Sequence, residues 1–270
     1  MDLPAGMSRY AAVIEYNGSS FQGFQKQAST KNTVQENLEH ALSFVAAEPL
    51  TVICAGRTDA GVHACTQVVH FDTLVTRSTK AWVEGSNTRL PSAVRVLHCQ
   101  PVPFTFHARF SALARVYRYI TLTRTVESAV LKNLVTWRKH ALDFDAMVDA
   151  AQFLLGEQDF SSFRASQCQA KSPVRQMEYV TLRQTGDFVV TEVKANAFLH
   201  HMVRNIMGAL FEVGRGAKPP NWIDTVLRAR DRRQNAATAP AHGLYFVGVD
   251  YPSEFAIPST PKGPLWLPEL

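Results

Sequence analysis

The sequence predicts a globular protein of interspersed strands and helices that is divided into two domains. Its 270 residues are 46% apolar, which is enough for a sizeable core in one large domain or two of ordinary size. Both halves share a rough order of strand, helix, strands, helix and strand, although no sequence repeat joins them. A segment rich in proline and phenylalanine, 101–111, indicates an extended connection between the halves. We therefore expect domains at 1–107 and 108–251, followed by a proline-rich extended tail at 252–270.

The first half begins with a strand at 9–16, which the turn Asn17-Gly18 ends. A helix follows, because Thr33 and Glu36 form a capping box and apolar residues then recur at helical spacing. These apolar residues are Val34, Leu38, Ala41, Leu42 and Val45. The remaining elements expected in this half are strands at 51–55 and 67–71, a helix near 80–87 and a strand near 93–98.

The second half opens on a strand at 114–123 and continues with a helix near 144–155, which Gly156 is placed to end. Strands at 174–183 and 187–195 flank Gln184-Thr185-Gly186, which is a hairpin signal. A helix near 199–213 has an apolar stripe on one side, and a further helix near 222–230 precedes a strand at 243–251. The polar side of the helix at 199–213 carries His200, His201, Arg204 and Asn205.

Charge and cysteine content restrict the partners and the compartment. The net charge is +5, with a sequence pI near 9.1, and the excess of basic residues lies entirely beyond His107. Such a surplus is compatible with a polyanionic partner such as nucleic acid. The four cysteines form no Cys-x-x-Cys pair, so they suggest neither a disulfide framework nor a thiolate zinc site. No apolar stretch approaches a membrane span and the first residues lack signal-peptide features, so we expect a cytoplasmic protein.

The segment Gly56-Arg57-Thr58-Asp59-Ala60-Gly61-Val62-His63-Ala64 is a polar loop between two apolar runs that are typical of strands. Asp59 is therefore a carboxylate on a loop held by a sheet, where functional side chains concentrate. It is our candidate catalytic residue. Taken alone, however, an Asp before a glycine-containing turn more often serves only to cap that turn.

Six further blocks accompany this loop in a fixed order. With the loop, they make the chain resemble the tRNA pseudouridine synthase A family over almost its whole length. The blocks are 16–18 with 23–27, then 106–112, 115–119, 156–164, 200–208 and 243–245. Departures are minor: Phe24 replaces the usual tryptophan, and the segment 90–94 lacks the acidic residue that often follows its proline.

The resemblance implies an α+β pseudouridine synthase fold with two domains, each an antiparallel sheet backed by helices, and an active cleft between them. It also implies an isomerase that converts uridine to pseudouridine at positions 38, 39 and 40 in the anticodon stem-loop of tRNAs. The family acts as a homodimer and needs neither cofactor nor metal. The adjacent His200 and His201 would diverge on a helix, unlike the i, i+4 histidines of zinc hydrolases.

Residue roles follow from matching positions. Asp59 is the nucleophile, and three routes stay open: attack on the uracil ring, attack on the ribose, or removal of a ribose proton. Arg204 is the charge partner that keeps this carboxylate ionised. Tyr117 would stack on the flipped uracil, although its position alone favours a core tyrosine, since tyrosine is a common strand residue. Leu244 would help enclose the base, although a buried strand leucine needs no special role.

Contacts with tRNA are assigned to basic and polar loop residues, although each arginine taken singly is more commonly a solvated surface residue. The expected RNA-binding residues are Arg57, Arg77, Phe106, His107, Ala108, Arg109, Phe110, Gln167, Cys168, Gln169, Ala170 and Lys171.

Three other functions remain compatible with parts of this pattern. A non-catalytic tRNA-binding or folding protein of the same fold would have no need of Asp59, Tyr117 and Arg204 together. An acid-base hydrolase built on Asp59 would require a second active-site carboxylate, which the sequence does not locate. A pseudouridine synthase acting on another RNA position would keep the same chemistry.

Overall fold

A computed structural model describes residues 6–258 and 263–267 of the chain. Within these residues it contains ten strands and five α-helices, so the predicted α+β class is confirmed. The chain forms two compact units. Unit 1 comprises Met1–Leu113 with Phe246–Pro264, and unit 2 comprises Ala114–Tyr245 with Leu265–Leu270.

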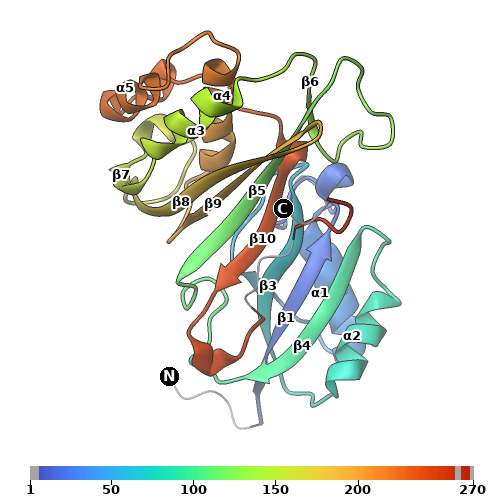
Figure 1. Cartoon of the computed structure of the whole chain (residues 1–270). Coiled ribbons are helices and arrows are strands. Elements are labelled where there is room, and N and C mark those ends of the chain that lie inside the picture. The colour runs from blue at the N-terminus through green and yellow to red at the C-terminus, as the bar shows by residue number, and fades with distance from the viewer. Residues whose placement is uncertain (1–5, 259–262, 268–270) are drawn as a thin grey trace. The chain divides into compact units, whose positions relative to one another are not determined.

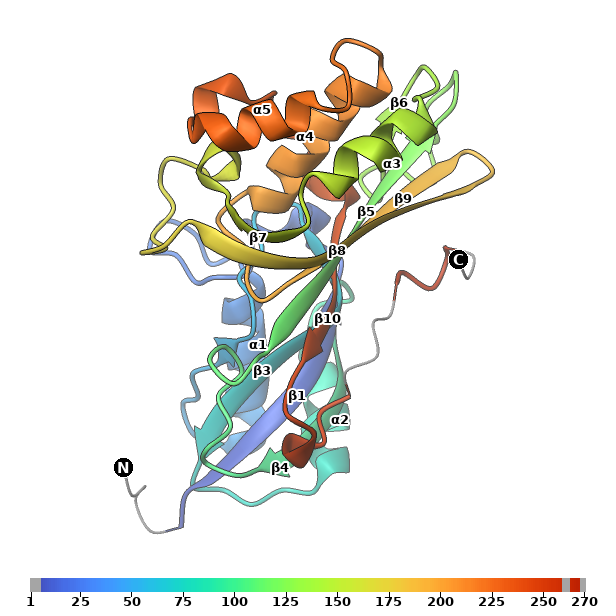
Figure 2. The same cartoon turned by 60° about the vertical axis from the view of Figure 1, so that its left-hand side comes forward.

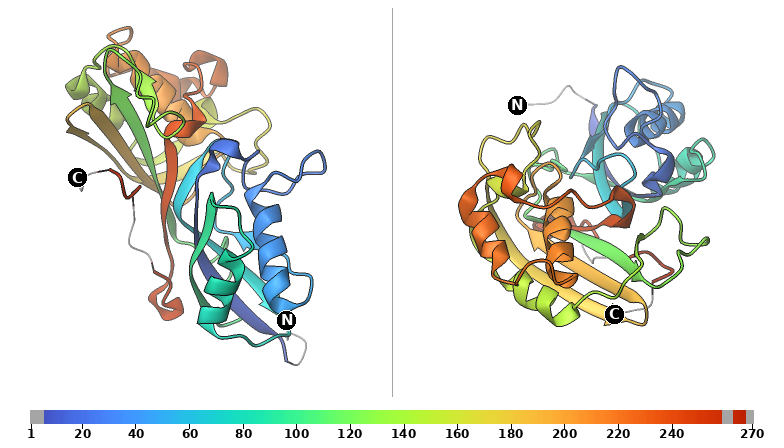
Figure 3. Two further views of the ribbon diagram at one scale, coloured as in Figure 1. Left: turned by 90° about the vertical axis from the view of Figure 1, so that its right-hand side faces the viewer. Right: turned by 90° about the horizontal axis from the view of Figure 1, so that it is seen from above.

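Unit 1 is built on an antiparallel arrangement around its first strand. β1 (Ser8–Tyr16) pairs with β3 (His63–Thr73) on one side and with β4 (Val94–Val102) on the other (Figure 1). The short β2 (Ile53–Cys54) pairs with the other edge of β3, where most of β10 (Leu244–Asp250) also adds. α1 (Val34–Ala46) and α2 (Thr79–Asn87) lie on one face of this sheet (Figure 3).

An aromatic cluster attaches α2 to the sheet of unit 1. The ring centroid of fully buried Trp82 lies 5.3 Å from that of Tyr10 on β1 and 5.0 Å from that of Phe71 on β3. Buried aromatic rings contribute large apolar areas and favour such tilted arrangements. The cluster therefore fixes α2 against β1 and against β3, the strand that follows the Asp59 loop.

Unit 2 is built mainly on antiparallel strands. β5 (Ala114–Thr123) pairs with β9 (Phe188–Ala195), β9 with β8 (Val174–Thr185), and β8 with β7 (Gly156–Asp159). The short β6 (Thr136–Arg138) runs parallel to β5. The three helices of this unit cover one face of the sheet (Figure 2). They are α3 (Phe144–Gln152), α4 (Met202–Gly214) and α5 (Trp222–Ala229).

Local signals explain where several elements begin. The Thr33 hydroxyl accepts a hydrogen bond from the Glu36 backbone N–H at 3.3 Å, as the capping box predicts. Gly186 adopts a φ of +53° in the turn between β8 and β9, as the hairpin signal predicts. Asp143 caps α3 through the backbone N–H of Ala146 at 3.0 Å.

Other sequence expectations are wrong in detail. The strand expected at 51–55 shrinks to the two residues of β2, and the short strands β6 and β7 were not predicted. α3 ends before Gly156, which has a φ of +83° and begins β7 instead of capping the helix. α4 begins only at Met202, because His201 has a left-handed φ of 63° that no helix can continue. His200 and His201 thus precede the helix rather than lying on its polar side.

The two units differ from the domain boundaries expected from the sequence. Residues 108–113 belong to unit 1, where the Tyr251 hydroxyl donates to the Ala108 carbonyl at 2.6 Å and the Leu113 N–H donates to the Asp250 carbonyl at 2.8 Å. Phe246–Pro264 also belongs to unit 1, in which β10 pairs with β3.

The expected tail at 252–270 is packed in its first part. Ser253–Phe255 forms a 3-10 helix, and the Phe255 ring lies 5.2 Å from that of Phe106. The Phe255 backbone carbonyl accepts a hydrogen bond from the Gln100 side chain at 3.0 Å. Residues 259–262 and 268–270 of this tail lie outside the described residues. Across the residues that are described, none of the helices has both the length and the apolar character that a membrane crossing requires.

Candidate active site

The Asp59 loop connects β2 to β3 and is held by backbone hydrogen bonds from a distant segment of unit 1. The Thr58 carbonyl accepts from the Phe24 N–H at 3.0 Å, and the Phe21 carbonyl accepts from the Gly61 N–H at 3.4 Å. The Val62 N–H donates to the Asp59 carbonyl at 3.2 Å and closes the turn. Asp59 is half-buried on a loop whose backbone is therefore anchored on both sides of the carboxylate.

Two glycines permit this close packing. A Cβ atom on Gly18 would lie 1.9 Å from the Val62 carbonyl oxygen, and one on Gly23 would lie 2.9 Å from the Thr58 carbonyl oxygen. Gly23 also has a φ of +92°, which side-chain-bearing residues rarely adopt. The segment from Gly18 to Gly23 can lie against the Asp59 loop only because both positions lack a side chain.

Buried polar side chains hold the start of the same loop. The Gln67 amide donates to the Gly56 carbonyl at 2.6 Å and accepts from the Gly56 N–H at 3.3 Å. The Tyr16 and Thr58 hydroxyls are hydrogen-bonded at 2.7 Å. Burial raises the pKa of the Tyr16 phenol, so it stays protonated. Gln67 is a site residue that the sequence does not single out, because β3 also carries other polar side chains such as Thr66 and His70.

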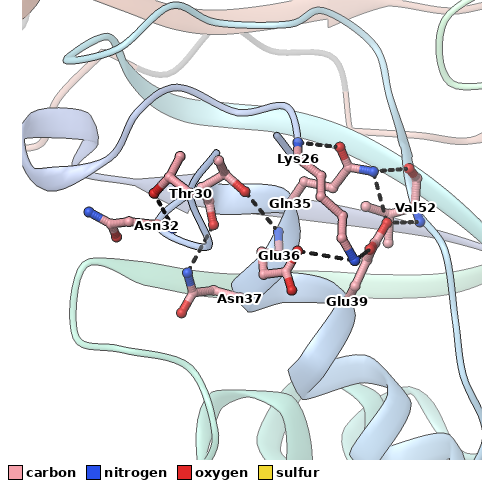
Figure 4. A network of polar contacts seen from close by, with 9 residues as sticks. Lys26, Thr30, Asn32, Gln35, Glu36, Asn37, Glu39 and Val52 are labelled. Atoms are coloured by element: carbon pink, nitrogen blue, oxygen red, sulfur yellow. Dashed lines mark hydrogen bonds and ion pairs between the residues drawn. The ribbon is translucent and has the colours of Figure 1, made fainter. Parts of the chain in front are cut away.

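A polar network connects α1 with Lys26, which precedes the helix, and with Val52, which follows it (Figure 4). The Gln35 side chain accepts from the Lys26 N–H at 2.9 Å and donates to the Glu39 carboxylate at 2.8 Å. The same carboxylate accepts from the Val52 N–H at 3.1 Å and lies 3.6 Å from the Lys26 ammonium. Glu39 is a buried carboxylate, and these partners replace the water it loses.

Three of the predicted site residues belong to unit 2. Tyr117 on β5 is largely buried and meets the Phe198 ring edge to face, with centroids 5.0 Å apart. Leu244 is the buried first residue of β10. Arg204 lies in the first turn of α4, and its Nε donates to the Ala239 carbonyl at 2.9 Å. That bond uses one of the five guanidinium N–H groups and fixes the plane of the guanidinium group.

The segment 237–239 lies directly against α4. A Cβ atom on Gly208 would lie 2.1 Å from the Ala237 carbonyl oxygen. The fully buried Asn205 donates to the Phe163 carbonyl at 2.7 Å and accepts from the Thr238 hydroxyl at 2.7 Å and from Arg232 Nη2 at 3.1 Å. Asn205 therefore sets the position of the helical turn that carries Arg204.

An open pocket of about 370 Å³ lies at the beginning of α4. It is lined by Ala165, Ser166, Gln167, His200, His201, Asn205, Arg232 and Thr238. The ring centroids of His200 and His201 are only 4.1 Å apart, so the expectation that these side chains diverge on a helix is wrong. The expected absence of a metal stays a prediction.

The expected RNA-binding residues divide by accessibility. Arg57, Arg77, Arg109 and Phe110 are exposed and His107 is half-buried, whereas the loop 167–171 is exposed or half-buried throughout. The side chains of Phe106 and Ala108 are fully buried. These two residues hold the loop from inside, and their side chains are not available to a tRNA.

The predicted site residues thus fall into two sets. Asp59, Arg57, Arg77 and 106–110 belong to unit 1, and Tyr117, 167–171, Arg204 and Leu244 belong to unit 2. Each set is held by bonds within its own unit. That Asp59 meets Tyr117 and Arg204 in one cleft stays a prediction.

His70 supplies a pH-dependent contribution to the stability of the loop 106–110. Its Nδ1 accepts a hydrogen bond from the Ala108 N–H at 3.1 Å, so this nitrogen must stay unprotonated. Burial, helped by the positive charge of Arg9, lowers the His70 pKa to about 4. An unfolded histidine has a pKa near 6.5, so between about pH 6.5 and 4 the unfolded state binds more protons than the folded state.

We therefore expect the free energy of unfolding to fall as the pH is lowered from about 6.5 to 4, with up to about 3 kcal/mol due to His70. Urea unfolding at a series of pH values measures the slope. His70→Gln keeps an acceptor that does not titrate, so its profile should be flatter over this range. A variant profile parallel to that of the wild type would contradict the role of His70.

Comparisons with known proteins place these features in a family. The family model for tRNA pseudouridine synthase matches residues 12–111 and 150–252. A protein from Pseudomonas aeruginosa called tRNA pseudouridine synthase A is 53% identical over 98% of this chain and 93% of its own length. Proteins of the same name from Vibrio parahaemolyticus and Nitrosococcus oceani are 52% and 54% identical, over 97% and 93% of this chain and 98% and 96% of their own lengths.

Among solved structures, one described as a crystal structure of a Cbf5-Nop10-Gar1 complex covers 75% of this chain and 45% of its own. At 12% identity and a TM-score of 0.34, that likeness carries no argument. The matched residues come from both units and include the Asp59 loop, α4 and β10, whereas β5 lies between the two matched ranges. The chain therefore belongs to the tRNA pseudouridine synthase family.

Proposed function

We propose that this protein isomerises uridine to pseudouridine at positions 38, 39 and 40 in the anticodon stem-loop of tRNAs. The observation that carries the proposal is the Asp59 carboxylate on a loop whose backbone is anchored by the segment 18–24 and by Gln67. A carboxylate held in this way needs little reorganisation when it reacts. The name shared by relatives more than 50% identical supports tRNA as the substrate.

The reaction breaks the glycosidic bond at N1 of uracil, turns the ring and rejoins it through C5, so product and substrate have the same composition. Asp59 acts in its ionised form, by attack on the base, by attack on the ribose or by removal of a ribose proton. Tyr117 stacks on the extracted uracil and Leu244 limits the space around it. Arg204, oriented through Ala239, holds the negative charge of the carboxylate.

The exposed arginines and polar loops hold the remainder of the tRNA through its phosphates. This role belongs to Arg57, Arg77, Arg109 and the loop 167–171. The buried side chains of Phe106 and Ala108 support the loop 106–110 from inside. We further infer that the enzyme acts as a cytoplasmic homodimer without a metal or cofactor. Cys54, Cys65, Cys99 and Cys168 form no disulfide, which is compatible with a reducing compartment.

Incubation with unmodified tRNA tests the proposal directly. Transcripts with uridine at only one of positions 38, 39 and 40 are treated with the purified protein, and pseudouridine is mapped by a chemical reaction specific for it. We expect modification at each of the three positions and none in a transcript with cytidine at all three. A protein that binds these transcripts without forming pseudouridine would overturn the enzymatic assignment, and modification elsewhere would overturn the positions.

A further inference from the structure

The loop between β4 and β5 presents an aromatic ring to solvent. Phe110 has 76% of its surface exposed and is the most exposed aromatic side chain among the described residues. A single exposed apolar residue needs no explanation by itself. The ordered arrangement of the side chains behind this ring, however, does need an explanation.

The Phe110 ring is backed by a second ring in parallel orientation. Its centroid lies 4.3 Å from that of His107, with 28° between the planes. The His107 ring is itself fixed, because its Nδ1 accepts hydrogen bonds from the backbone N–H groups of Arg109 at 3.2 Å and of Phe110 at 3.1 Å. Behind His107 lies the buried His70, with ring centroids 4.7 Å apart. Three rings thus lead from the interior to the surface.

The backbone of this loop is held independently of any ligand. The Ser111 N–H donates to the His107 carbonyl, and the His107 N–H donates to the Ser111 hydroxyl, both at 2.9 Å. Arg9, paired with Asp72, donates to the Phe106 carbonyl at 2.8 Å. The conformational entropy of presenting the ring is therefore lost during folding rather than on binding, which favours affinity.

The surroundings of the ring favour a nucleic acid over an apolar partner. The Arg109 guanidinium carbon lies 5.5 Å from the Phe110 centroid, so a positive charge accompanies the π surface. Burial lowers the pKa of His107, whose Nδ1 already accepts two N–H groups, so the backing ring is neutral at physiological pH. A flat ring beside a cation suits a nucleotide, in which a base stacks on the aromatic face and a phosphate meets the arginine.

We propose that Phe110, supported by His107, is a stacking surface for an unpaired nucleobase of the tRNA. The proposal rests on the proposed function, since it assumes that this loop faces the RNA. It assigns separate tasks within the loop: Phe110 binds a base, Arg109 binds a phosphate, and His107 positions the Phe110 ring. Stacking on a single aromatic residue commonly changes affinity by about 5- to 100-fold.

Binding measurements on Phe110 variants test the proposal. We expect Phe110→Ala and Phe110→Leu to weaken the binding of unmodified tRNA by about 10-fold, and Phe110→Trp to bind at least as tightly as the wild type. The dependence of affinity on salt should stay unchanged in these variants, whereas Arg109→Ala should reduce it. Phe44→Ala is the matched control, because Phe44 is 54% exposed on α1 with the Arg89 guanidinium 3.7 Å from its ring centroid. It should bind within about twofold of the wild type.

A spectroscopic measurement separates stacking from loss of apolar area. An anticodon stem-loop RNA carrying 2-aminopurine at one unpaired loop position at a time should lose fluorescence at one position on binding to the wild type but not to Phe110→Ala. Unchanged affinity of Phe110→Ala, or wild-type affinity of Phe110→Leu, would overturn the proposal. The proposal would also fail if Phe110→Ala changed the molar mass of the protein, measured by light scattering, without changing RNA affinity. The Phe110 ring would then contact another protein chain rather than RNA. If the wild type bound the RNA with this quenching but formed no pseudouridine, the proposed function would fail while the stacking assignment stood.

Discussion

Replacing Asp59 with alanine should lower the rate of pseudouridine formation by at least about 10³-fold and leave tRNA affinity within about threefold of the wild type. The carboxylate is the reacting group in every route that remains open, so its removal affects the transition state. Backbone bonds at Thr58, Gly61 and Val62 hold the loop, so the loss of this one side chain should not rearrange the surface that faces the RNA. Single-turnover rates and equilibrium binding of the same unmodified tRNA measure the two effects separately.

Two further variants make this result specific. Asp59→Asn keeps the size and removes the charge, so it should be as inactive as Asp59→Ala. Glu84→Gln removes a carboxylate of the same unit that lies on the surface of α2 near Lys80, and it should keep wild-type rates. Retention of a tenth of the wild-type rate by Asp59→Asn, or loss of tRNA binding by Asp59→Ala, would contradict the assignment of Asp59 as the reacting group.

Substituting Gly18 with alanine should strongly destabilise the fold of unit 1, although it adds only a single methyl group. The added Cβ would lie 1.9 Å from the Val62 carbonyl oxygen, and a backbone atom cannot move aside as a flexible side chain can. Overpacking of this kind costs about 1 to 3 kcal/mol or more. Because Val62 closes the turn at Asp59, the shift should also displace the carboxylate, so we expect activity to fall about 10²-fold.

Urea unfolding and single-turnover rates measure the two effects of Gly18→Ala. Gly85→Ala is the comparison, since the atom nearest to its Cβ would belong to the Val45 side chain, at 2.9 Å, and alanine favours the helix α2. It should stay within about 1 kcal/mol of the wild type and keep full activity. Equal effects of the two substitutions would show that the packing of Gly18 against Val62 does not position the loop.

Elements defined by short-range patterns were predictable from the sequence. The capping residue Thr33 and the apolar repeat of α1, the hairpin of β8 and β9, and the start of α3 depend on residues within one or two turns of one another. The errors occur where a local signal had two possible uses. Gly156 was read as the end of a helix, but its positive φ serves the start of β7, which is formed by pairing with β8.

The candidate site was predictable only as a set of residues. Family blocks pointed to Asp59, Tyr117, Arg204 and Leu244, but they treated 106–110 as one RNA-binding unit. The structure separates this loop into an inner part, with Phe106 against Tyr251 and Phe255, and an outer part that carries Phe110. A family match assigns a segment to a function, whereas burial decides which side chains can reach a ligand.

The sequence by itself determined the α+β class, the order of most elements, the family and the candidate carboxylate. Periodicity, capping and turn signals act between near neighbours, and the family blocks are runs of consecutive residues. Only the tertiary structure decided that Gly18 packs against Val62 and that the Gln67 side chain bonds both backbone groups of Gly56. It also decided that the His70 ring contacts the His107 ring on which Phe110 stacks. The contacts of Gly18 with Val62 and of His70 with His107 join residues far apart in the chain, and nothing in the local pattern of either partner identifies the other.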